Sequence, residues 1–220
     1  LMNLPEDFKD SKVEKDKLRG EDRWILTRLD ETIADVEGKI EKYDIGLAAE
    51  AVHDFIWDEY CDWYIEMVKP RLYGDDIDDR EVVYAVLLDV LEKILTMLHP
   101  FMPFITEEIY SFLPGTEGEL IGATWPESGV YNYDDDVENI GVVREAIRGI
   151  RNAKAEMDIE PHRKSKLYVL TEEAKRGDLY KEMEGHFVNL ANITEIELID
   201  NRQDVSDDVI SVVTEKAELF

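Results

Sequence analysis

From Asp22 to Met157, apart from a loop at 114–135, apolar residues recur every three or four residues, the spacing of one face of an α-helix. The first apolar stripe predicts a long helix with Asp22 as its N-cap, because a short acidic side chain accepts hydrogen bonds from free amide groups at that position. A second helix is expected over residues 44–70 and a third over about residues 80–98. The third is apolar on nearly all sides, which predicts a place in the middle of a bundle. The first stripe consists of Leu26, Leu29, Ile33, Val36, Ile40 and Tyr43.

A fourth helix is expected from Pro103 to Leu113, and a fifth over about residues 137–157. Beyond Pro161 the apolar pattern shifts toward alternation, which predicts strands near 166–170, 194–199 and 209–214 and a helix between the first two. The predicted fold is therefore mainly α, an antiparallel helical bundle with a small C-terminal α/β subdomain. Three segments are expected: a linker over 1–21, the bundle over 22–157 with a loop at 114–135, and the α/β subdomain over 158–220.

The charge of the chain is extreme, with 52 Asp and Glu against 25 Lys and Arg and a formal net charge of -27. Such a protein should repel nucleic acid at low ionic strength. The acids are spread over periodic segments, which argues against a disordered acidic tail. Adaptation to molar salt, where charge repulsion is screened, accounts for this composition and predicts a halophilic host. One acidic row at helical spacing, which we interpret as a solvated face, consists of Glu50, Asp54, Asp58, Asp62 and Glu66.

The single cysteine, Cys61, has no partner for an internal disulfide, and the four histidines are too dispersed for a zinc site. The apolar neighbours of Cys61 at helical spacing favour a packing role for this thiol over a nucleophilic one. No apolar run approaches the length of a membrane span, and no secretory signal is recognisable. We therefore expect a cytoplasmic protein without a metal site or a membrane partner.

One segment departs from the acidic character of the chain. Residues 144–166 hold seven basic and four acidic residues. Each basic residue of the fifth helix comes one position after a residue of its apolar stripe, so the basic side chains share one face of the helix. Arginine pairs well with phosphate. This stripe is a candidate for contacts with an RNA backbone, and the alternative is internal pairing with the acids of the bundle. It consists of Arg144, Arg148, Arg151 and Lys154.

Several runs of the sequence resemble the anticodon-binding domain of class I valyl-tRNA synthetases, and they occur in the order expected for that family over nearly the whole chain. The runs are DRWILTRL at 22–29, YD at 43–44, WDEYCDWYIE at 57–66, LHPFMPFITEE at 98–108, WP at 125–126 and IRGIR at 147–151. The resemblance implies a module that recognises the anticodon of a valine tRNA.

Two alternative interpretations remain. The isoleucyl enzymes share the same plan, but they are less similar at Cys61 and at His99, where a Ser-Asn-Trp-Tyr-type run and an Ala-Pro-type turn replace the residues of this chain. A helical protein-interaction module without an RNA role is the interpretation that charge and apolar stripes alone would favour.

The family activates its amino acid with ATP on a separate Rossmann domain, and the two signature motifs of that domain do not occur in these 220 residues. No glycine-rich phosphate loop is present either. The resemblance therefore implies that this chain alone is inactive as a ligase and binds no cofactor, with ATP bound by the catalytic domain. The expected partners are valine tRNA and that catalytic domain, and the protein is expected to be a monomer.

In the family the starts of the first two helices lie near the anticodon. The resemblance therefore implies that Arg23 and Arg28 contact phosphates or bases, and that Ile45 stands where a phenylalanine often meets an anticodon base. The alternative for both arginines is pairing with neighbouring acids such as Asp22 or Glu31. The aromatic residues of the motifs, among them Trp57 and Phe104, are expected to pack inside the bundle or against the catalytic domain.

Overall fold

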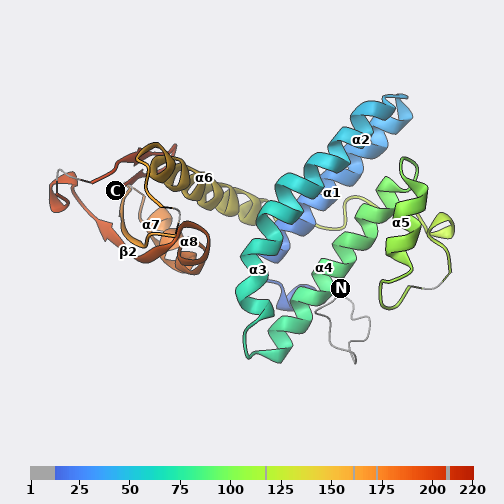
Figure 1. Ribbon diagram of the computed structural model, residues 1–220, viewed down its shortest axis with the longest axis horizontal. Helices are drawn as coiled ribbons and strands as arrows, with labels where there is room; N and C mark the ends of the chain where they lie inside the picture. The colour runs from blue at the N-terminus through green and yellow to red at the C-terminus, as the bar shows by residue number, and fades with distance from the viewer. Residues whose placement is uncertain (1–12, 117, 161, 172, 207–208) are drawn as a thin grey trace. The chain divides into compact units, whose positions relative to one another are not determined.

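The computed structural model describes residues 13–220 apart from 117, 161, 172 and 207–208. The chain forms two compact units that divide between Val137 and Glu138 (Figure 1). Of the linker expected over 1–21, residues 1–12 lie outside the described residues. A short 3-10 turn, η1 (Lys15–Lys17), and the beginning of the first helix occupy the rest.

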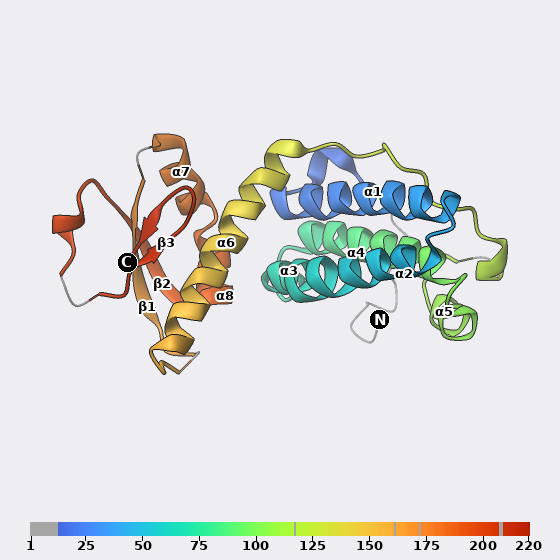
Figure 2. The ribbon, with the colours of Figure 1, turned by 90° about the horizontal axis from the view of Figure 1, so that it is seen from above.

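The first unit is a helical bundle, as predicted. Helix α1 and the composite helix α2–η2–α3 run antiparallel to each other beside α4 (Figures 1 and 2). Helix α4 packs against α1, α2, α3 and α5, which confirms its predicted place in the middle of the bundle. The helices are α1 (Gly20–Glu41), α2 (Ile45–Asp54), η2 (Phe55–Tyr64), α3 (Ile65–Leu72), α4 (Ile77–Leu98) and α5 (Pro103–Tyr110).

The start of α1 differs from the prediction. The helix begins at Gly20 instead of after an Asp22 cap. Asp22 lies inside the first turn, where its Oδ2 accepts a hydrogen bond from the backbone N–H of Arg19 at 3.0 Å. Its side chain is fully buried. Spacing alone cannot tell a capping aspartate from one in the first turn that is bonded elsewhere in the fold.

A buried ionic cluster connects α1, α3 and α4. Nη1 of Arg71 donates to Glu21 at 2.8 Å and to both carboxylate oxygens of Asp22 at 2.8 and 2.9 Å. Its Nε and Nη2 donate to Asp79 at the start of α4. Tyr64 donates from its hydroxyl to Asp22 at 2.8 Å. Burial raises the pKa of Asp22, while the Arg71 guanidinium acts in the opposite direction and keeps the carboxylate in an ion pair.

The middle of the second long helix is wider than an α-helix. Residues Phe55–Tyr64 form a π-helical segment, η2, whereas the sequence predicted an uninterrupted helix ending at Pro70. The helix in fact runs through Pro70 to Leu72, where the buried Arg71 holds its end. Trp57 on η2 is 55% exposed, so it does not pack in this bundle. Cys61 is half-buried, and burial raises its pKa, which favours the protonated thiol and a packing role.

The loop between α5 and α6 (Asp134–Glu156) is held to α1 by hydrogen bonds. The backbone N–H of Tyr131 donates to Oδ2 of Asp30 at 2.9 Å, and that of Tyr133 donates to Oγ1 of Thr27 at 3.1 Å. Both acceptors are buried on α1. This connection contains the 3-10 turn η3 (Leu120–Gly122) and passes Trp125 before α6 begins.

The second unit is a four-stranded sheet with helices, as predicted. The strand order is β2-β1-β4-β3, with β1 parallel to β2 and the other pairs antiparallel. Helices α7 and α8 pack against β2. Strands β1 and β2 lie where the alternating pattern predicted them, whereas α8, β4 and the shortness of β3 were not predicted. The elements are α6 (Asp134–Glu156), β1 (Ser165–Leu170), α7 (Ala174–Glu182), α8 (Glu184–Ala191), β2 (Ile193–Ile199), η4 (Arg202–Asp204), β3 (Val212–Val213) and β4 (Glu218–Leu219).

Most of α6 belongs to the second unit, although we placed the domain boundary after residue 157. The reason is a close approach between α6 and β3. A Cβ atom on Gly149 would lie 2.6 Å from Cγ1 of Val212, so only glycine allows this spacing. Ile150, the next residue, lines a cavity that it shares with residues of β1 and β4. Glycine at this position is a packing requirement that the periodic pattern of α6 does not reveal.

In the described part of the chain, no helix is both long enough and apolar enough to cross a membrane.

Candidate nucleic-acid interface

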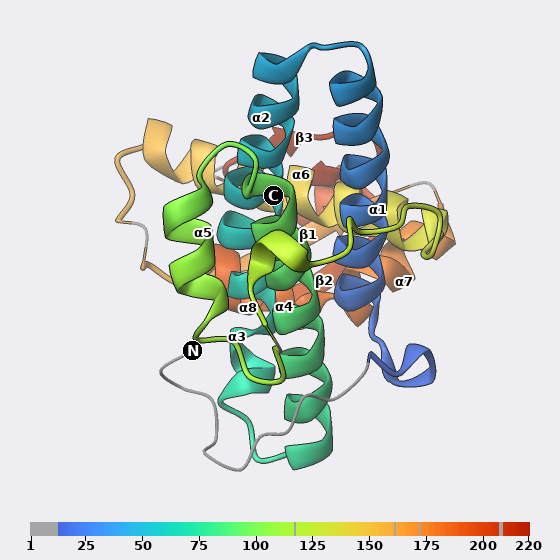
Figure 3. The same ribbon diagram turned by 90° about the vertical axis from the view of Figure 1, so that its right-hand side faces the viewer.

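Apolar side chains gather around the turn that joins α1 to α2. Figure 3 shows this turn at the top of the bundle. Tyr43 lies in the turn, is 88% exposed and has a backbone φ of 63°, a left-handed conformation that costs a bulky residue energy. We placed Tyr43 on the buried stripe of α1, and the structure corrects this, because α1 ends at Glu41 and the turn directs the ring outward. Strained residues of this kind concentrate at functional sites.

Ile45 starts α2 beside Tyr43 and is 48% exposed. It lines a cavity of about 440 Å³ together with Ile40, Pro100, Phe101 and Trp125. The Nε1 of Trp125 is buried and has no hydrogen-bond partner among the described residues, so this cavity-lining residue keeps an unused N–H donor. An apolar cavity with an indole and an unused donor has the properties needed to hold an unstacked base.

The rim of this cavity is acidic. Glu37 and Glu41 line it from the end of α1. Carboxylates accept hydrogen bonds from the amino groups of bases, although they repel phosphates. The arrangement therefore suits contact with base edges more than contact with an RNA backbone. We name Tyr43, Ile45, Phe101 and Trp125 the hairpin-end site.

Arg23, which the resemblance implied as an RNA contact, is engaged within the first unit. Its Nε donates to Asp136 at 2.6 Å and its Nη2 to the same carboxylate at 3.1 Å. Nη1 donates to the backbone carbonyl of Leu18 at 2.8 Å. This bidentate pair raises the pKa of Arg23. In this structure the guanidinium joins α1 to the first residues of α6.

Arg28 is partly exposed but is also paired. It bonds Glu31 one turn along α1, and its Nη2 lies 3.6 Å from Oε1 of Glu59 on η2. The pairing with Glu31 is the alternative that the sequence left open. Surface ion pairs of this type contribute little stability, and their arginine can exchange partners at low cost.

The basic stripe of α6 has contacts inside the second unit. Nε of Arg151 donates to the carbonyl of Leu190 at 2.8 Å, and Nζ of Lys154 donates to the carbonyl of Ala191 at 2.8 Å. These are the last carbonyls of α8, which lack partners within their own helix. Arg144 is half-buried and Arg148 is exposed, and both also have partners in the structure. Two members of the stripe therefore cap a helix.

The seven sequence-predicted residues thus divide between the units. Ile45 joins a cavity with residues that sequence reasoning assigned to packing or to a loop. The basic residues have internal partners, and their contact with RNA stays a prediction. Tyr43 and Trp125 were missed as site residues. The signal that could have found Trp125 was an aromatic residue in a loop rich in glycine, proline and aspartate, where burial is not expected.

The chain belongs to the family described as the anticodon-binding domain of tRNA ligase, whose model matches residues 22–169 and so includes the helical bundle. The relatives of this chain include proteins named valine–tRNA ligase. That of Clostridium perfringens is 40% identical over 227 residues, covering 100% of this chain and 25% of the relative. Those of Clostridium tetani and Thermotoga maritima are 39% and 38% identical, covering 99% and 92% of this chain and 24% and 22% of the relatives. The chain therefore spans about a quarter of the length of these relatives.

Proposed function

We propose that this chain recognises the anticodon loop of a valine tRNA as one module of a valine–tRNA ligase. The observation that carries the proposal is the hairpin-end site, where exposed and half-buried apolar side chains line a cavity at one end of the bundle and the exposed Tyr43 lies beside Ile45. The family and the relatives support the same conclusion. Stacking of an unpaired base on an aromatic or apolar surface is sequence-tolerant, so the edge contacts of Glu37, Glu41 and Trp125 would supply selectivity.

Binding of a valine anticodon stem-loop should depend on Ile45 but not on a similar isoleucine elsewhere. We expect Ile45→Ala to weaken binding by about three- to tenfold and Trp125→Ala by about tenfold or more, because stacking contributes roughly 1–3 kcal/mol per base. Fluorescence anisotropy in about 1 M KCl, which suppresses non-specific phosphate binding, provides the measurement. Ile77→Ala is the matched control, since Ile77 is also the first residue of a helix, is 60% exposed and does not line the hairpin-end cavity.

Equal weakening by the Ile45 and Ile77 variants would contradict the proposed site. A wild-type chain that binds a scrambled loop as tightly as the valine loop would favour the protein-interaction alternative. A preference for the isoleucine anticodon in swapped stem-loops would instead favour the isoleucyl assignment.

Arg23 and Arg28, which the resemblance implied as RNA contacts, differ in the stability that each would lose by leaving its ion pair for a phosphate. Arg28 could turn from Glu31 to a phosphate with little loss of stability. Arg23 would have to leave a bidentate pair with Asp136. We therefore propose that Arg28 is the residue that reaches the RNA backbone and that Arg23 fixes the start of α6.

We further propose that α5 and the loop after it contact the catalytic domain of the same polypeptide, which would also hold the ATP. Phe104 is 91% exposed on α5, and Phe112 and Ile121 beyond it are also exposed. Phe104 and Ile121 line one shallow cavity, and exposed apolar surface of this kind marks an interface. We expect this chain to bind the separately expressed ATP-binding half in a pull-down measurement. Phe104→Asp should abolish that binding.

We propose that the acidic surface reflects adaptation to high salt in a cytoplasm. The acidic row Glu50, Asp54, Asp58 and Asp62 is exposed on α2 and η2, as expected for a solvated face. Like charges four residues apart disfavour a helix, and salt screens them.

We expect the melting temperature to rise by about 5–10 °C or more between low salt and about 2 M KCl. The triple variant Glu50→Gln, Asp54→Asn, Asp58→Asn should show a smaller rise, and a salt-independent melting temperature would refute this adaptation.

A further inference from the structure

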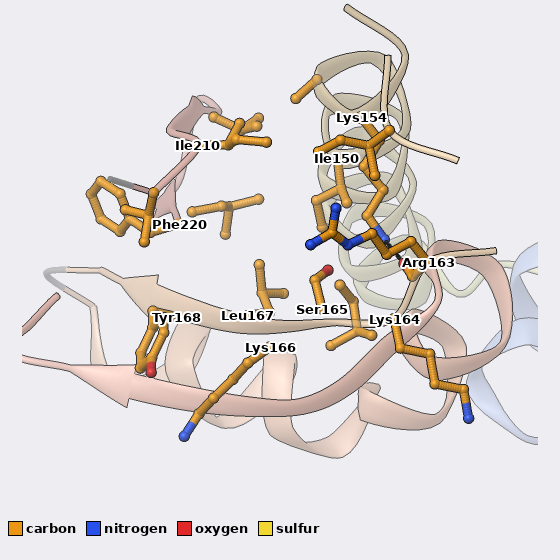
Figure 4. A pocket seen from close by; sticks show the side chains of 16 residues that line it. Ile150, Lys154, Arg163, Lys164, Ser165, Lys166, Leu167, Tyr168, Ile210 and Phe220 are labelled. Atoms are coloured by element: carbon orange, nitrogen blue, oxygen red, sulfur yellow. Dashed lines mark hydrogen bonds between the residues drawn. The ribbon is translucent and has the colours of Figure 1, made fainter. Parts of the chain in front are cut away.

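The second unit contains a cavity that anticodon reading does not use. It has a volume of about 300 Å³ and lies between α6 and the strands β1, β3 and β4 (Figure 4). Ile150, Leu167, Val212 and Leu219 form an aliphatic lining, with Phe220 at one side. In Figure 4 the side chains of Ser165 and Leu167 rise from β1 toward this space, while those of Lys166 and Tyr168 point to the other side of the strand. A volume of this size is at the lower end for small-molecule sites.

Two cations stand at one end of the cavity. Lys154 is 7% exposed, and its Nζ donates to the carbonyls of Arg163 at 3.0 Å and Ala191 at 2.8 Å. Both partners are neutral, and none of the described residues pairs a carboxylate with this ammonium. Burial lowers the pKa of Lys154, as expected for a charge without a counter-ion. A buried charge left in this state is costly, and an anion at the site would offset the cost.

The guanidinium of Arg163 is the second cation. In Figure 4 it extends from the start of β1 over the cavity, toward Ser165 and Ile150. Across the described residues it forms no ion pair. Lys164, the next residue, points away from the cavity in the same view.

The lining of this cavity also differs in charge from the rest of the protein. Asp and Glu make up 52 of the 220 residues, nearly one in four. None of the 16 described residues that line the cavity is acidic. The described lining therefore presents no side-chain carboxylate that would repel a bound anion.

We propose that this cavity binds a small aliphatic carboxylate. Its carboxylate would lie between Arg163 and Lys154, and its hydrocarbon chain would cover Ile150, Leu167 and Leu219. Arginine provides paired donors that match a carboxylate. An aliphatic ligand is favoured over a nucleotide because the lining offers branched side chains and a single phenylalanine in place of facing aromatic rings. Such a site is independent of tRNA binding at the hairpin end.

Octanoate is a suitable probe for this site. Titration into the 220-residue chain labelled at isoleucine methyl groups should give saturable shifts at Ile150 and Ile193, which line the cavity, and not at Ile45. We expect Arg163→Gln to weaken binding by about tenfold or more, because a charge-assisted paired contact is lost. Lys164→Gln removes a neighbouring charge that points away, and it should change the affinity by less than about twofold. Ala153→Leu, which fills the cavity without altering charge, should also weaken binding.

Octanol and acetate are the ligand controls, because octanol lacks the carboxylate and acetate lacks the hydrocarbon chain. Each should bind much more weakly than octanoate. Absence of saturable octanoate binding, equal loss in the Arg163 and Lys164 variants, or equal binding of octanol or acetate would overturn the proposal. Shifts of the same methyl groups by a tRNA stem-loop but not by octanoate would also overturn it, and would assign these cations to RNA. Unchanged circular dichroism of the variants shows that loss of binding does not come from unfolding.

Discussion

Arg71→Met is expected to destabilise the first unit by about 3–5 kcal/mol, because it removes the cation from a buried ionic cluster. The guanidinium of Arg71 bonds Glu21 and Asp22, whose side chains are 6% and 0% exposed. Without it, the buried carboxylates of Glu21 and Asp22 lose the guanidinium that bonds them both. Methionine fills the volume of the stem but supplies no donors, so the effect measures the lost ion pairs more than a cavity.

Urea unfolding followed by tryptophan fluorescence is the measurement for this variant. All four tryptophans precede residue 138, so their emission reports on the first unit alone. Arg28→Met is the matched control, because its ion pairs with Glu31 and Glu59 are more exposed. We expect this control to lose less than about 1 kcal/mol. Equal losses in the two variants would show that the buried cluster has no special role in stability.

Gly149→Ala is expected to destabilise the second unit by about 1–3 kcal/mol, although alanine favours an exposed helix by roughly 1 kcal/mol over glycine. The new methyl group would lie 2.6 Å from Cγ1 of Val212, so α6 and β3 must move apart. Amide hydrogen exchange of β1, which lies between β2 and β4 in the sheet, measures the loss in a unit without tryptophan.

Two further variants make this prediction specific. Gly141 lies on the same helix, and a Cβ there would meet nothing within 4 Å. Gly141→Ala should therefore stabilise the protein by about 0.5–1 kcal/mol, the opposite sign. Val212→Ala combined with Gly149→Ala should recover part of the loss, because the two sites are in contact. Equal effects of alanine at both glycines would show that α6 and β3 do not approach closely.

The helical bundle was predictable from the sequence because burial of an apolar stripe depends on residues close together in the chain. Helix α4 illustrates this, since its many apolar positions placed it in the middle before any contact was known. The strands β1 and β2 were predictable for the same reason. The short elements β4 and α8 were missed because two to eight residues carry too little periodicity to distinguish a strand or helix from a turn.

The partners of charged side chains, unlike the apolar periodicity of the helices, could not be predicted from the sequence. Lys154 and Arg151 formed a convincing basic stripe in sequence, yet they donate to carbonyls at the end of α8. Arg23 was assigned to RNA and bonds Asp136, more than a hundred positions away. A cation has many possible partners of similar strength, and only the fold decides which of them comes within bonding distance.

By itself the sequence determined the class of fold, the order of the long helices and the resemblance to an anticodon-binding module, because these depend on local periodicity and on ordered motifs. Only the tertiary structure decided that Tyr43 points outward beside Ile45, that Ile45 and Trp125 line one cavity, and that Lys154 and Arg163 share another. Both sites join residues far apart in the chain. Their chemistry depends on burial and on the presence or absence of a partner, which are properties of the folded arrangement.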